Sequence, residues 1–275
     1  MKIVRTVEEF RELRKDLTSV GFVPTMGALH EGHLALIRKS AEENAETVIS
    51  VFVNPLQFGP SEDFAKYPRQ EARDIELAES AGATIGFFPE KGDFLNNFLT
   101  NVVPIGAAEG YEGAIRPGHF TGVATIVTKL VNVVLPNVAY FGLKDLQQCA
   151  VIRQVFRDLS IDVRLSFVET IREESGLALS SRNAYLSVDS RQRAATIFAV
   201  LNMSASKILD GQKTIEVCQA GKKTLEDSGF EVEYFDLVDF ETMRAINSVK
   251  EGARLITAAR LDGVRLIDNV DVSPM

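Results

Sequence analysis

Three histidines, His30, His33 and His119, are the first candidates for chemistry in this chain of 275 residues. All three are expected in glycine-bearing loops rather than in apolar helix or strand interiors. Each alone is more often solvated or structural, but His30 and His33 lie together in HEGH, where a helix is expected to begin. Free backbone N–H groups and the helix dipole favour phosphate at such a place, and imidazole can add a hydrogen bond or a positive charge. The pair therefore predicts a phosphate site.

Two familiar motifs do not fit this loop. Gly27 and Gly32 have the spacing of a P-loop, but His33 and Leu34 replace its lysine and its hydroxyl residue. The histidines are one residue too close for the zinc motif H-E-x-x-H, and no cysteine pair supplies further ligands. The sequence also lacks the dinucleotide fingerprint G-x-G-x-x-G. A mononucleotide site remains.

Five segments, taken in order, resemble the pantothenate synthetase family of pantoate–β-alanine ligases, within the HIGH-type nucleotidylyltransferase superfamily. They are PTMGALHEGH, FVNPLQF, RPGHF, FGLKD with two glutamines following, and LALSSRNAYL, and they span residues 24–186. The C-terminal part also has the expected length. The resemblance implies that pantoate and ATP give an enzyme-bound pantoyl adenylate and pyrophosphate, after which the amine of β-alanine gives pantothenate and AMP.

The resemblance also implies which residues bind ATP and carry the chemistry. The expected catalytic residues are His33, His30, Lys144 and Arg182, with His33 donating a proton or hydrogen bond during transfer. Residues 180–182 resemble a mobile loop of the KMSKS type that closes on the phosphates. The residues expected to bind ATP are Met26, Gly27, Ala28, Leu29, His30, Glu31, Gly32, His33, Gly142, Leu143, Lys144, Asp145, Ile171, Leu179, Ser180, Ser181 and Arg182.

The other two substrates are assigned by the same resemblance. Gln57 and Gln148 are expected to hold pantoate, because neutral amides bind its hydroxyls and carboxylate without a fixed charge. Gln57 is also expected near β-alanine, with Asn54 orienting the amine. Arg116 and His119, in RPGHF, are expected to make a secondary contribution to the site.

One residue departs from the family pattern, which usually reads FGEKD. Leu143 replaces that glutamate, so a carboxylate is missing beside Lys144, and ATP affinity or the orientation of the lysine is the property expected to change. No metal ligand is assigned. Glu71, Asp74 and Glu76 are too ordinary for that role, and Mg²⁺ is expected to arrive on the phosphates of ATP.

The elements that must position these residues alternate along the first part of the chain. Apolar runs over 21–26, 47–53, 85–88, 138–141 and 161–168 predict strands. Helical patterns begin at a capping box of Thr6 and Glu9, with Gly21 as the expected helix end, and recur after residue 33, over 70–81, over 120–135 and over 144–159. This alternation predicts an α/β fold with a doubly wound, Rossmann-like parallel sheet over residues 1–170.

The pattern changes near residue 171. Residues 171–275 are expected to form a smaller α+β domain, with two helices and a run of strands, that closes over ATP. Within it Asp262-Gly263 predicts a hairpin turn between strands over 254–261 and 264–270.

Composition limits the other possibilities. The net charge of −8 argues against nucleic acid as a partner, and no apolar run is long enough to cross a membrane. The N-terminal residues do not resemble a secretion signal, so a cytoplasmic protein is expected. Cys149 and Cys218, the only cysteines, are expected to be reduced and structural. The family resemblance suggests a homodimer acting on small molecules.

Two alternatives remain, the first another enzyme of the same superfamily and the second a protein of a different functional class. One is a nucleotidylyltransferase that releases a nucleotidylated product, against which VNPLQF and SSRN argue. The other is a catalytically silent nucleotide-binding or sensor protein, against which the retention of His33 and Lys144 argues mildly. A tRNA-aminoacylating role is disfavoured because the chain is short and acidic.

Overall fold

The computed structural model describes residues 1–60, 62 and 64–274, which form two compact units. The first unit comprises Met1–Gly142 and Val151–Val168, and the second comprises Leu143–Ala150 and Glu169–Met275. The first is an α/β unit with a parallel sheet and the second is a smaller α+β unit. The predicted fold class is therefore confirmed.

The first unit is built on a six-stranded parallel sheet with the order β1-β4-β3-β2-β5-β6. Its strands are β1 (Lys2–Val4), β2 (Val20–Thr25), β3 (Glu46–Val51), β4 (Ile85–Phe87), β5 (Val138–Gly142) and β6 (Arg164–Val168). The chain runs outward from β2 through β3 to β4, and the later strands β5 and β6 are added on the other side of β2. The order thus reverses between β2 and β5, and the carboxyl ends of strands at such a switch point are where open α/β sheets bind ligands.

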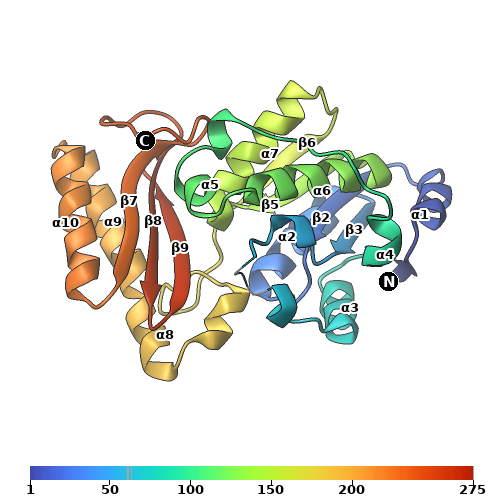
Figure 1. Cartoon of the computed structure of the whole chain (residues 1–275), viewed down its shortest axis with the longest axis horizontal. Coiled ribbons are helices and arrows are strands. Elements are labelled where there is room, and N and C mark those ends of the chain that lie inside the picture. Colours follow the sequence, from blue (N-terminus) through green and yellow to red (C-terminus); the bar gives the residue numbers. More distant parts are fainter. Residues whose placement is uncertain (61, 63, 275) are drawn as a thin grey trace. The chain divides into compact units, whose positions relative to one another are not determined.

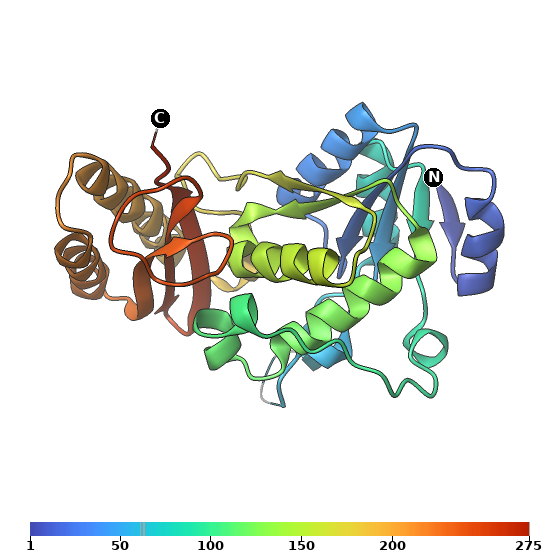
Figure 2. The ribbon, with the colours of Figure 1, turned by 90° about the horizontal axis from the view of Figure 1, so that it is seen from above.

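Helices cover both faces of this sheet. They are α1 (Val7–Arg14), α2 (Glu31–Glu43), α3 (Glu71–Ser80), α4 (Lys91–Phe94), α5 (Tyr111–Ile115), α6 (His119–Val134) and α7 (Leu146–Asp158), with 3-10 turns η1 (Pro55–Gln57), η2 (Phe64–Lys66) and η3 (Gly106–Ala108) between them. Figure 2 shows α2 and α6 on opposite faces of the sheet. Ile37 of α2 and Ala78 of α3 pack on Val23 and Ile49 in a buried cluster. The loops at the carboxyl ends are thereby attached to a rigid base.

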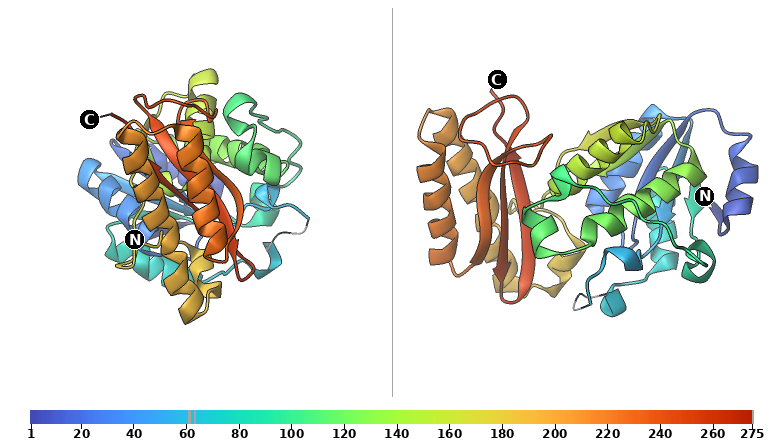
Figure 3. Two further views of the ribbon diagram at one scale, coloured as in Figure 1. Left: turned by 90° about the vertical axis from the view of Figure 1, so that its left-hand side faces the viewer. Right: turned by 45° about the horizontal axis from the view of Figure 1, so that its top comes forward.

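The second unit has a three-stranded antiparallel sheet, β7 (Glu231–Asp239), β8 (Ala253–Leu261) and β9 (Val264–Asp271). Its helices are α8 (Val188–Ala194), α9 (Thr196–Leu209) and α10 (Thr214–Asp227), with 3-10 turns η4 (Leu143–Asp145) and η5 (Ser181–Tyr185). The helices α9 and α10 lie side by side on one face of this sheet (Figures 1 and 3). Their buried side chains, including Leu201 and Leu225, meet Leu237 and Leu255 of the strands. Burial of this kind is the main stabilising contribution.

Several local predictions are confirmed. Thr6 Oγ1 accepts from Glu9 N at 3.2 Å and Glu9 Oε2 accepts from Thr6 N at 3.1 Å, so the capping box at α1 is present. The hairpin between β8 and β9 turns at Asp262 and Gly263, with φ of 49° and 81°. Positive φ at both turn residues is what a two-residue hairpin of type I′ requires. Cys149 is a buried, reduced cysteine, as is Cys218.

Other local predictions are wrong in detail. Helix α1 ends at Arg14 rather than at Gly21, which lies inside β2. A Cβ on Gly21 would overlap with Ser40 Oγ, so this glycine permits α2 to pack closely on the strand rather than ending a helix. The strand β1 has no counterpart in the predictions, because three residues are too short for a periodic pattern. The second unit has three helices rather than two, and the helix predicted from residue 144 begins with the 3-10 turn η4.

No helix within residues 1–60, 62 and 64–274 combines the length and the apolar character that crossing a bilayer requires.

Candidate active site

The loop between β2 and α2 carries the predicted phosphate-binding residues at the centre of the parallel sheet. Thr25, the last residue of β2, donates from its hydroxyl to Ser50 O at 2.8 Å and accepts from Gly27 N at 3.1 Å. Gly27 and Ala28 then take positive φ values of 81° and 51°. The glycine avoids strain there, and a Cβ on it would also lie 2.9 Å from Asp74 Oδ2. Glycine is therefore required at position 27 for two reasons: the positive φ, and the lack of space for a Cβ.

Asp74 of α3 holds this turn from beneath. It is 1% exposed, and its carboxylate accepts from Ala28 N at 3.0 Å and from Leu29 N at 2.8 Å. Burial raises the pKa of this carboxyl, while the two backbone donors act in the opposite direction. Our sequence interpretation did not assign Asp74 a function. The available signal was its place on the face of α3 that also buries Ala78, where a carboxylate needs partners.

The two histidines of HEGH cap the helix that they begin. His30 is the N-cap of α2 and its Nδ1 accepts from Gly32 N at 3.2 Å, while His33 Nδ1 accepts from His30 N at 3.4 Å. An Nδ1 that accepts carries no proton, so a neutral ring in this arrangement carries its proton on Nε2. The rings lie 4.1 Å apart between centroids, tilted by 35°. Both imidazoles are half-buried.

This arrangement corrects one sequence-based expectation. The sequence predicted free backbone N–H groups at the start of α2, but those of Ala28, Leu29, His30 and Gly32 donate to side chains of the protein itself. These four amides are therefore already paired within the protein. His33 also lies within the first turn of α2 rather than in a loop.

The turn η1 follows β3 and carries Gln57. Asn54 is its N-cap, is 1% exposed, and accepts from Leu56 N at 3.1 Å through Oδ1. The Asn54 amide donates to Gln57 Oε1 at 2.9 Å and to Gly122 O of α6 at 3.0 Å. Asn54 is thus enclosed beneath the turn, whereas the Gln57 side chain is half-buried at its end.

Arg116 and His119, the expected second contributors, meet this same turn. His119 is the first residue of α6 and is 7% exposed, so the prediction that it lies in a loop is wrong. Its Nδ1 lies 3.0 Å from Gln57 O and its Nε2 lies 3.0 Å from Arg116 Nη1. Arg116 in turn donates from Nε and Nη2 to the two carboxylate oxygens of Glu62, both at 2.8 Å. The first unit therefore brings Arg116 and His119 together with Gln57, as a second group of predicted residues beside the histidines of HEGH.

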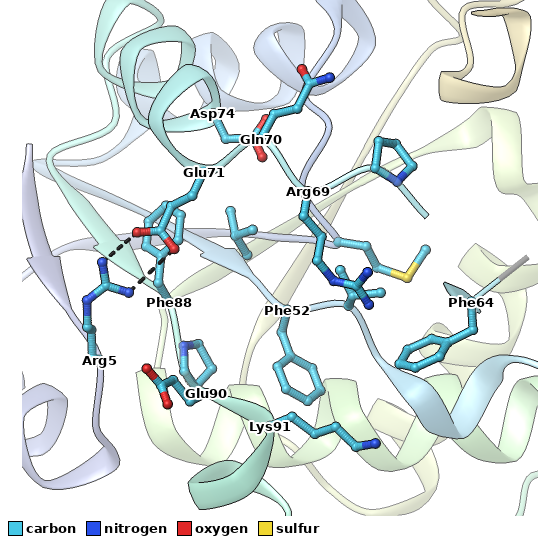
Figure 4. Close-up of a pocket in the computed structure, with 15 residues that line it drawn as sticks. Arg5, Phe52, Phe64, Arg69, Gln70, Glu71, Asp74, Phe88, Glu90 and Lys91 are labelled. Carbon is cyan, nitrogen blue, oxygen red and sulfur yellow. Dashed lines mark hydrogen bonds and ion pairs between the residues drawn. The ribbon is translucent and has the colours of Figure 1, made fainter. Parts of the chain in front are cut away.

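A cavity of about 250 Å³ opens at the carboxyl ends of β1, β3 and β4 (Figure 4). Met26 of the loop after β2 and Asp74 of α3 are among the lining residues. Arg5 pairs with Glu71 across the edge of the cavity (Figure 4). Met26 is the only residue of the predicted nucleotide and pantoate set that lines it. The cavity is therefore largely separate from the predicted binding residues for ATP and pantoate.

Of the predicted residues of FGLKD, Gly142 is the last residue of β5 in the first unit, and Leu143–Asp145 form η4 in the second unit. Leu143 is 4% exposed, and its carbonyl accepts from Asn269 Nδ2 of β9 at 2.7 Å. A glutamate at this place would bury a carboxylate, which explains why an apolar residue fits this chain. The side chain of Lys144 is 20% exposed and pairs with Asp145 at 3.3 Å. Gln148, in the first turn of α7, is half-buried.

The remaining predicted residues lie around η5, which like η4 contacts β9. Leu179 N donates to Ile171 O at 2.9 Å, which brings Ile171 beside the start of the turn. Ser180 is its N-cap and accepts from Arg182 N at 3.3 Å. Asn183, 5% exposed, donates to Ala178 O at 3.0 Å and anchors the turn. Residues 180–182 are thus attached to a buried base, and Ser181 and Arg182 are half-buried.

An ion pair links this region to β9. Arg172 donates to both carboxylate oxygens of Asp268, at 2.6 and 2.8 Å, and its guanidinium lies 3.7 Å from the centroid of Phe198. Among the residues that the structure describes, no three His, Cys, Asp or Glu side chains are grouped to hold a metal ion.

Comparison with known proteins supports the family resemblance along nearly the full length of the chain. A family model described as Pantoate-beta-alanine ligase matches residues 2–271. A protein of Rhizorhabdus wittichii named pantothenate synthetase is 46% identical over 100% of this chain and 99% of its own length. A pantothenate synthetase of Chloroflexus aggregans is 44% identical over 98% of this chain and 99% of its own.

Solved structures give the same result. The crystal structure of pantothenate synthetase from Thermus thermophilus matches with a TM-score of 0.94 and 45% identity, covering 100% of both chains. That of pantoate-beta-alanine ligase from Francisella tularensis, complexed with beta-gamma ATP and beta-alanine, matches with a TM-score of 0.83 and 33% identity over 98% of this chain and 97% of that one. With a family model, full-length relatives and full-length structures in agreement, this chain belongs to the pantoate-beta-alanine ligase family.

Proposed function

We propose that this enzyme condenses pantoate with β-alanine in two steps, through a pantoyl adenylate. The observation that carries the proposal is the capping box in which Nδ1 of His30 and Nδ1 of His33 accept backbone N–H groups, so that the neutral rings carry their N–H donors on Nε2. This capping box lies at the switch point of the sheet, in a chain that belongs to a ligase family. Fixed donors of this kind stabilise charge as it develops in a transition state without needing to reorganise. The Francisella relative, complexed with beta-gamma ATP and beta-alanine, supports the choice of two of the three substrates.

In the first step, a carboxylate oxygen of pantoate attacks the α-phosphorus of ATP and pyrophosphate leaves. Negative charge moves toward the leaving phosphates, so donors and cations must accompany it. We assign the Nε2–H groups of His33 and His30 to the phosphates, with Lys144 and Arg182 as the cations. Lys144 suits a moving charge because its ammonium is a point charge on a flexible stem. The remaining residues expected to contact ATP keep the assignments given above.

In the second step, the amine of β-alanine attacks the acyl carbon, the bond from that carbon to the AMP oxygen breaks, and one proton leaves the nitrogen. Gln57 and Gln148 are assigned to pantoate in both steps. Their amides bind the hydroxyls and the carboxylate of pantoate and so position its reacting carbon. Because the amides are neutral, they place no competing carboxylate near the anionic phosphate.

The magnesium ion is assigned to the nucleotide rather than to the chain. Mg²⁺ in such sites keeps several waters and is bound largely by substrate phosphates, and the described residues offer no cage of three acidic or imidazole ligands. The homodimer, the cytoplasmic location and the closure of the second unit over ATP stay predictions.

The test follows pyrophosphate and AMP separately. With ATP and pantoate alone, the enzyme is expected to exchange labelled pyrophosphate into ATP, and AMP is expected to appear steadily only after β-alanine is added. AMP release that is indifferent to the amine would contradict the ligase assignment. Release of a stable nucleotidylated product would instead favour the other class of nucleotidylyltransferase.

A further inference from the structure

We propose that Gln57 is placed by positioning residues: Arg116, His119 and Gly122 hold the backbone of its turn. Asn54 orients its amide, so that the Nε2 hydrogens face pantoate. This inference rests on the proposed role of Gln57 as a pantoate contact. All of the contacts that carry it lie within the first unit.

The first contact is a close approach of two backbones. Gly122, in the second turn of α6, faces η1 so closely that a Cβ on it would overlap with the Leu56 carbonyl and lie 2.5 Å from Gln57 N. Backbone atoms cannot move aside as a flexible side chain can. The turn that carries Gln57 therefore rests on a helix surface that only glycine leaves open.

The second contact decides which way the Gln57 amide points. Asn54 donates one amide hydrogen to Gly122 O and the other to Gln57 Oε1, at 3.0 and 2.9 Å. Because Gln57 Oε1 accepts from Asn54, it is the Nε2 hydrogens that are available to a ligand. A ligand at this place is thus recognised through acceptor oxygens, which the carboxylate and hydroxyls of pantoate supply. Asn54 acts through Gln57 in this account rather than on the amine of β-alanine.

The third contact holds the backbone of Gln57. A carbonyl oxygen can only accept, so His119 Nδ1 is the donor to Gln57 O, and Nε2 of the same neutral ring accepts from Arg116 Nη1. Burial and the neighbouring Arg116 lower the pKa of His119 to about 4, against smaller opposing effects of the hydrogen bond to the Gln57 backbone and of Glu112 and Glu62. The ring is therefore neutral at physiological pH, in the one tautomer that serves both partners.

The last contact fixes Arg116 itself. Its guanidinium binds Glu62 through two parallel hydrogen bonds of 2.8 Å, and the two side chains are 17% and 23% exposed. Bidentate pairing of this kind sets orientation as well as energy. The contacts run from Glu62 through Arg116 and His119 to the carbonyl of Gln57, the residue whose amide faces the ligand.

Two substitutions of His119 separate positioning from general damage. His119→Asn can keep a donor near the place of Nδ1, whereas His119→Leu keeps the apolar volume and removes the donor. We expect the KM for pantoate to rise about tenfold in His119→Leu and to stay within about threefold of wild type in His119→Asn, with the KM for ATP unchanged in both. Equal rises for pantoate and ATP in His119→Leu, or no rise at all, would overturn the proposal.

Gly122→Ala tests the close approach independently, with Gly92→Ala as its control because a Cβ on Gly92 has no atom within 4 Å. We expect Gly122→Ala to raise the KM for pantoate by about tenfold or more, and Gly92→Ala to leave it unchanged. Melting temperatures show whether each variant folds, and if Gly122→Ala does not, the two His119 variants decide the question. Equal pantoate KM values in folded Gly122→Ala and Gly92→Ala would refute the close approach as a determinant.

Gln57→Ala separates this inference from the function on which it rests. A Gln57→Ala enzyme with normal pantoate KM would remove Gln57 from the site, and the proposed function of that residue would fail. If Gln57→Ala is impaired while His119→Leu is normal, Gln57 keeps its role and only the positioning proposal fails.

Discussion

The two loops of the first unit that carry predicted substrate contacts are held in opposite ways. At the start of α2, His30 and His33 cap the helix through Nδ1, and in our proposal the same rings donate to the phosphates from Nε2, so one ring both positions and contacts. In the turn after β3, Gln57 is the contact, while Asn54 and His119 hold it in place. Substitution of His30 or His33 should therefore damage the helix start and the chemistry together. In the turn after β3, substitution of a supporting residue should leave the Gln57 side chain in place as a contact but poorly oriented.

The largest effect is expected at His33. His33→Ala removes both the cap and the donor, and we expect adenylation to slow by about 10²-fold or more, as when a preorganised donor is lost. His33→Asn can keep an acceptor near Nδ1 but has no donor near Nε2, so thermal stability should recover while the rate does not. Single-turnover pyrophosphate release and melting curves measure the two properties. Near wild-type adenylation in His33→Asn would contradict the role of Nε2–H.

A smaller but still substantial effect is expected at Asp74. Its carboxylate accepts from two successive backbone N–H groups, whereas Asp74→Asn has one acceptor oxygen and would place amide hydrogens against the other N–H. We expect a loss of about 1–3 kcal/mol in the free energy of unfolding, because a buried donor loses its partner. Adenylation should slow as well, since this loop leads into His30. Chemical denaturation and the adenylation rate check this. Wild-type values for both would show that Asp74 does not hold the loop.

An effect of about tenfold is expected at Asn54. In Asn54→Asp, a carboxylate faces Gln57 Oε1, so the Gln57 amide should rotate to donate from Nε2 and turn its oxygen toward the ligand. The KM for pantoate should then rise about tenfold, with little change in the KM for ATP. Steady-state kinetics with each substrate varied in turn measure the split. If ATP were affected as strongly as pantoate, Asn54 could not be a specific support of Gln57.

The smallest effect concerns pH and His119. Its pKa is lowered to about 4 in the folded chain from 6.5, so the unfolded state binds more protons between these values. The stability contributed by the neutral ring is complete above about pH 6.5 and is lost as the pH falls toward 4. We therefore expect the wild type to lose about 1 kcal/mol or more relative to His119→Asn, which cannot titrate, between about pH 7 and about pH 4. The free energy of unfolding of both proteins is measured as a function of pH. The same pH dependence in both would contradict a lowered pKa of His119.

Much of the fold could be predicted from the sequence, because apolar β-branched runs and helical periodicity report directly on burial. Runs such as residues 47–53 have the composition of a strand covered on both faces, and β3 is such a strand. Features set by partners distant in sequence could not be predicted in this way. The strand β1 is recognisable only through its pairing with β4, and the role of Gly21 only through Ser40 of α2.

The same limit applies to the site. His33, Gln57 and Lys144 could be assigned because they lie in motifs that resemble a family, and a motif is a local pattern. Asp74, Gly122 and Asn269 act through backbone groups of segments far away in sequence, and a backbone group leaves no signature in the residue type that it belongs to. Asn269, for instance, donates to the carbonyl of Leu143.

The most direct measurement follows oxygen from pantoate into AMP. Pantoate labelled with ¹⁸O in its carboxylate is incubated with the enzyme, ATP and β-alanine, and AMP and pyrophosphate are analysed by mass spectrometry. Attack of the carboxylate on the α-phosphorus, followed by cleavage at the acyl carbon, leaves one labelled oxygen in AMP and none in pyrophosphate. Labelled AMP is the result that the adenylate mechanism predicts, and AMP without label would contradict it.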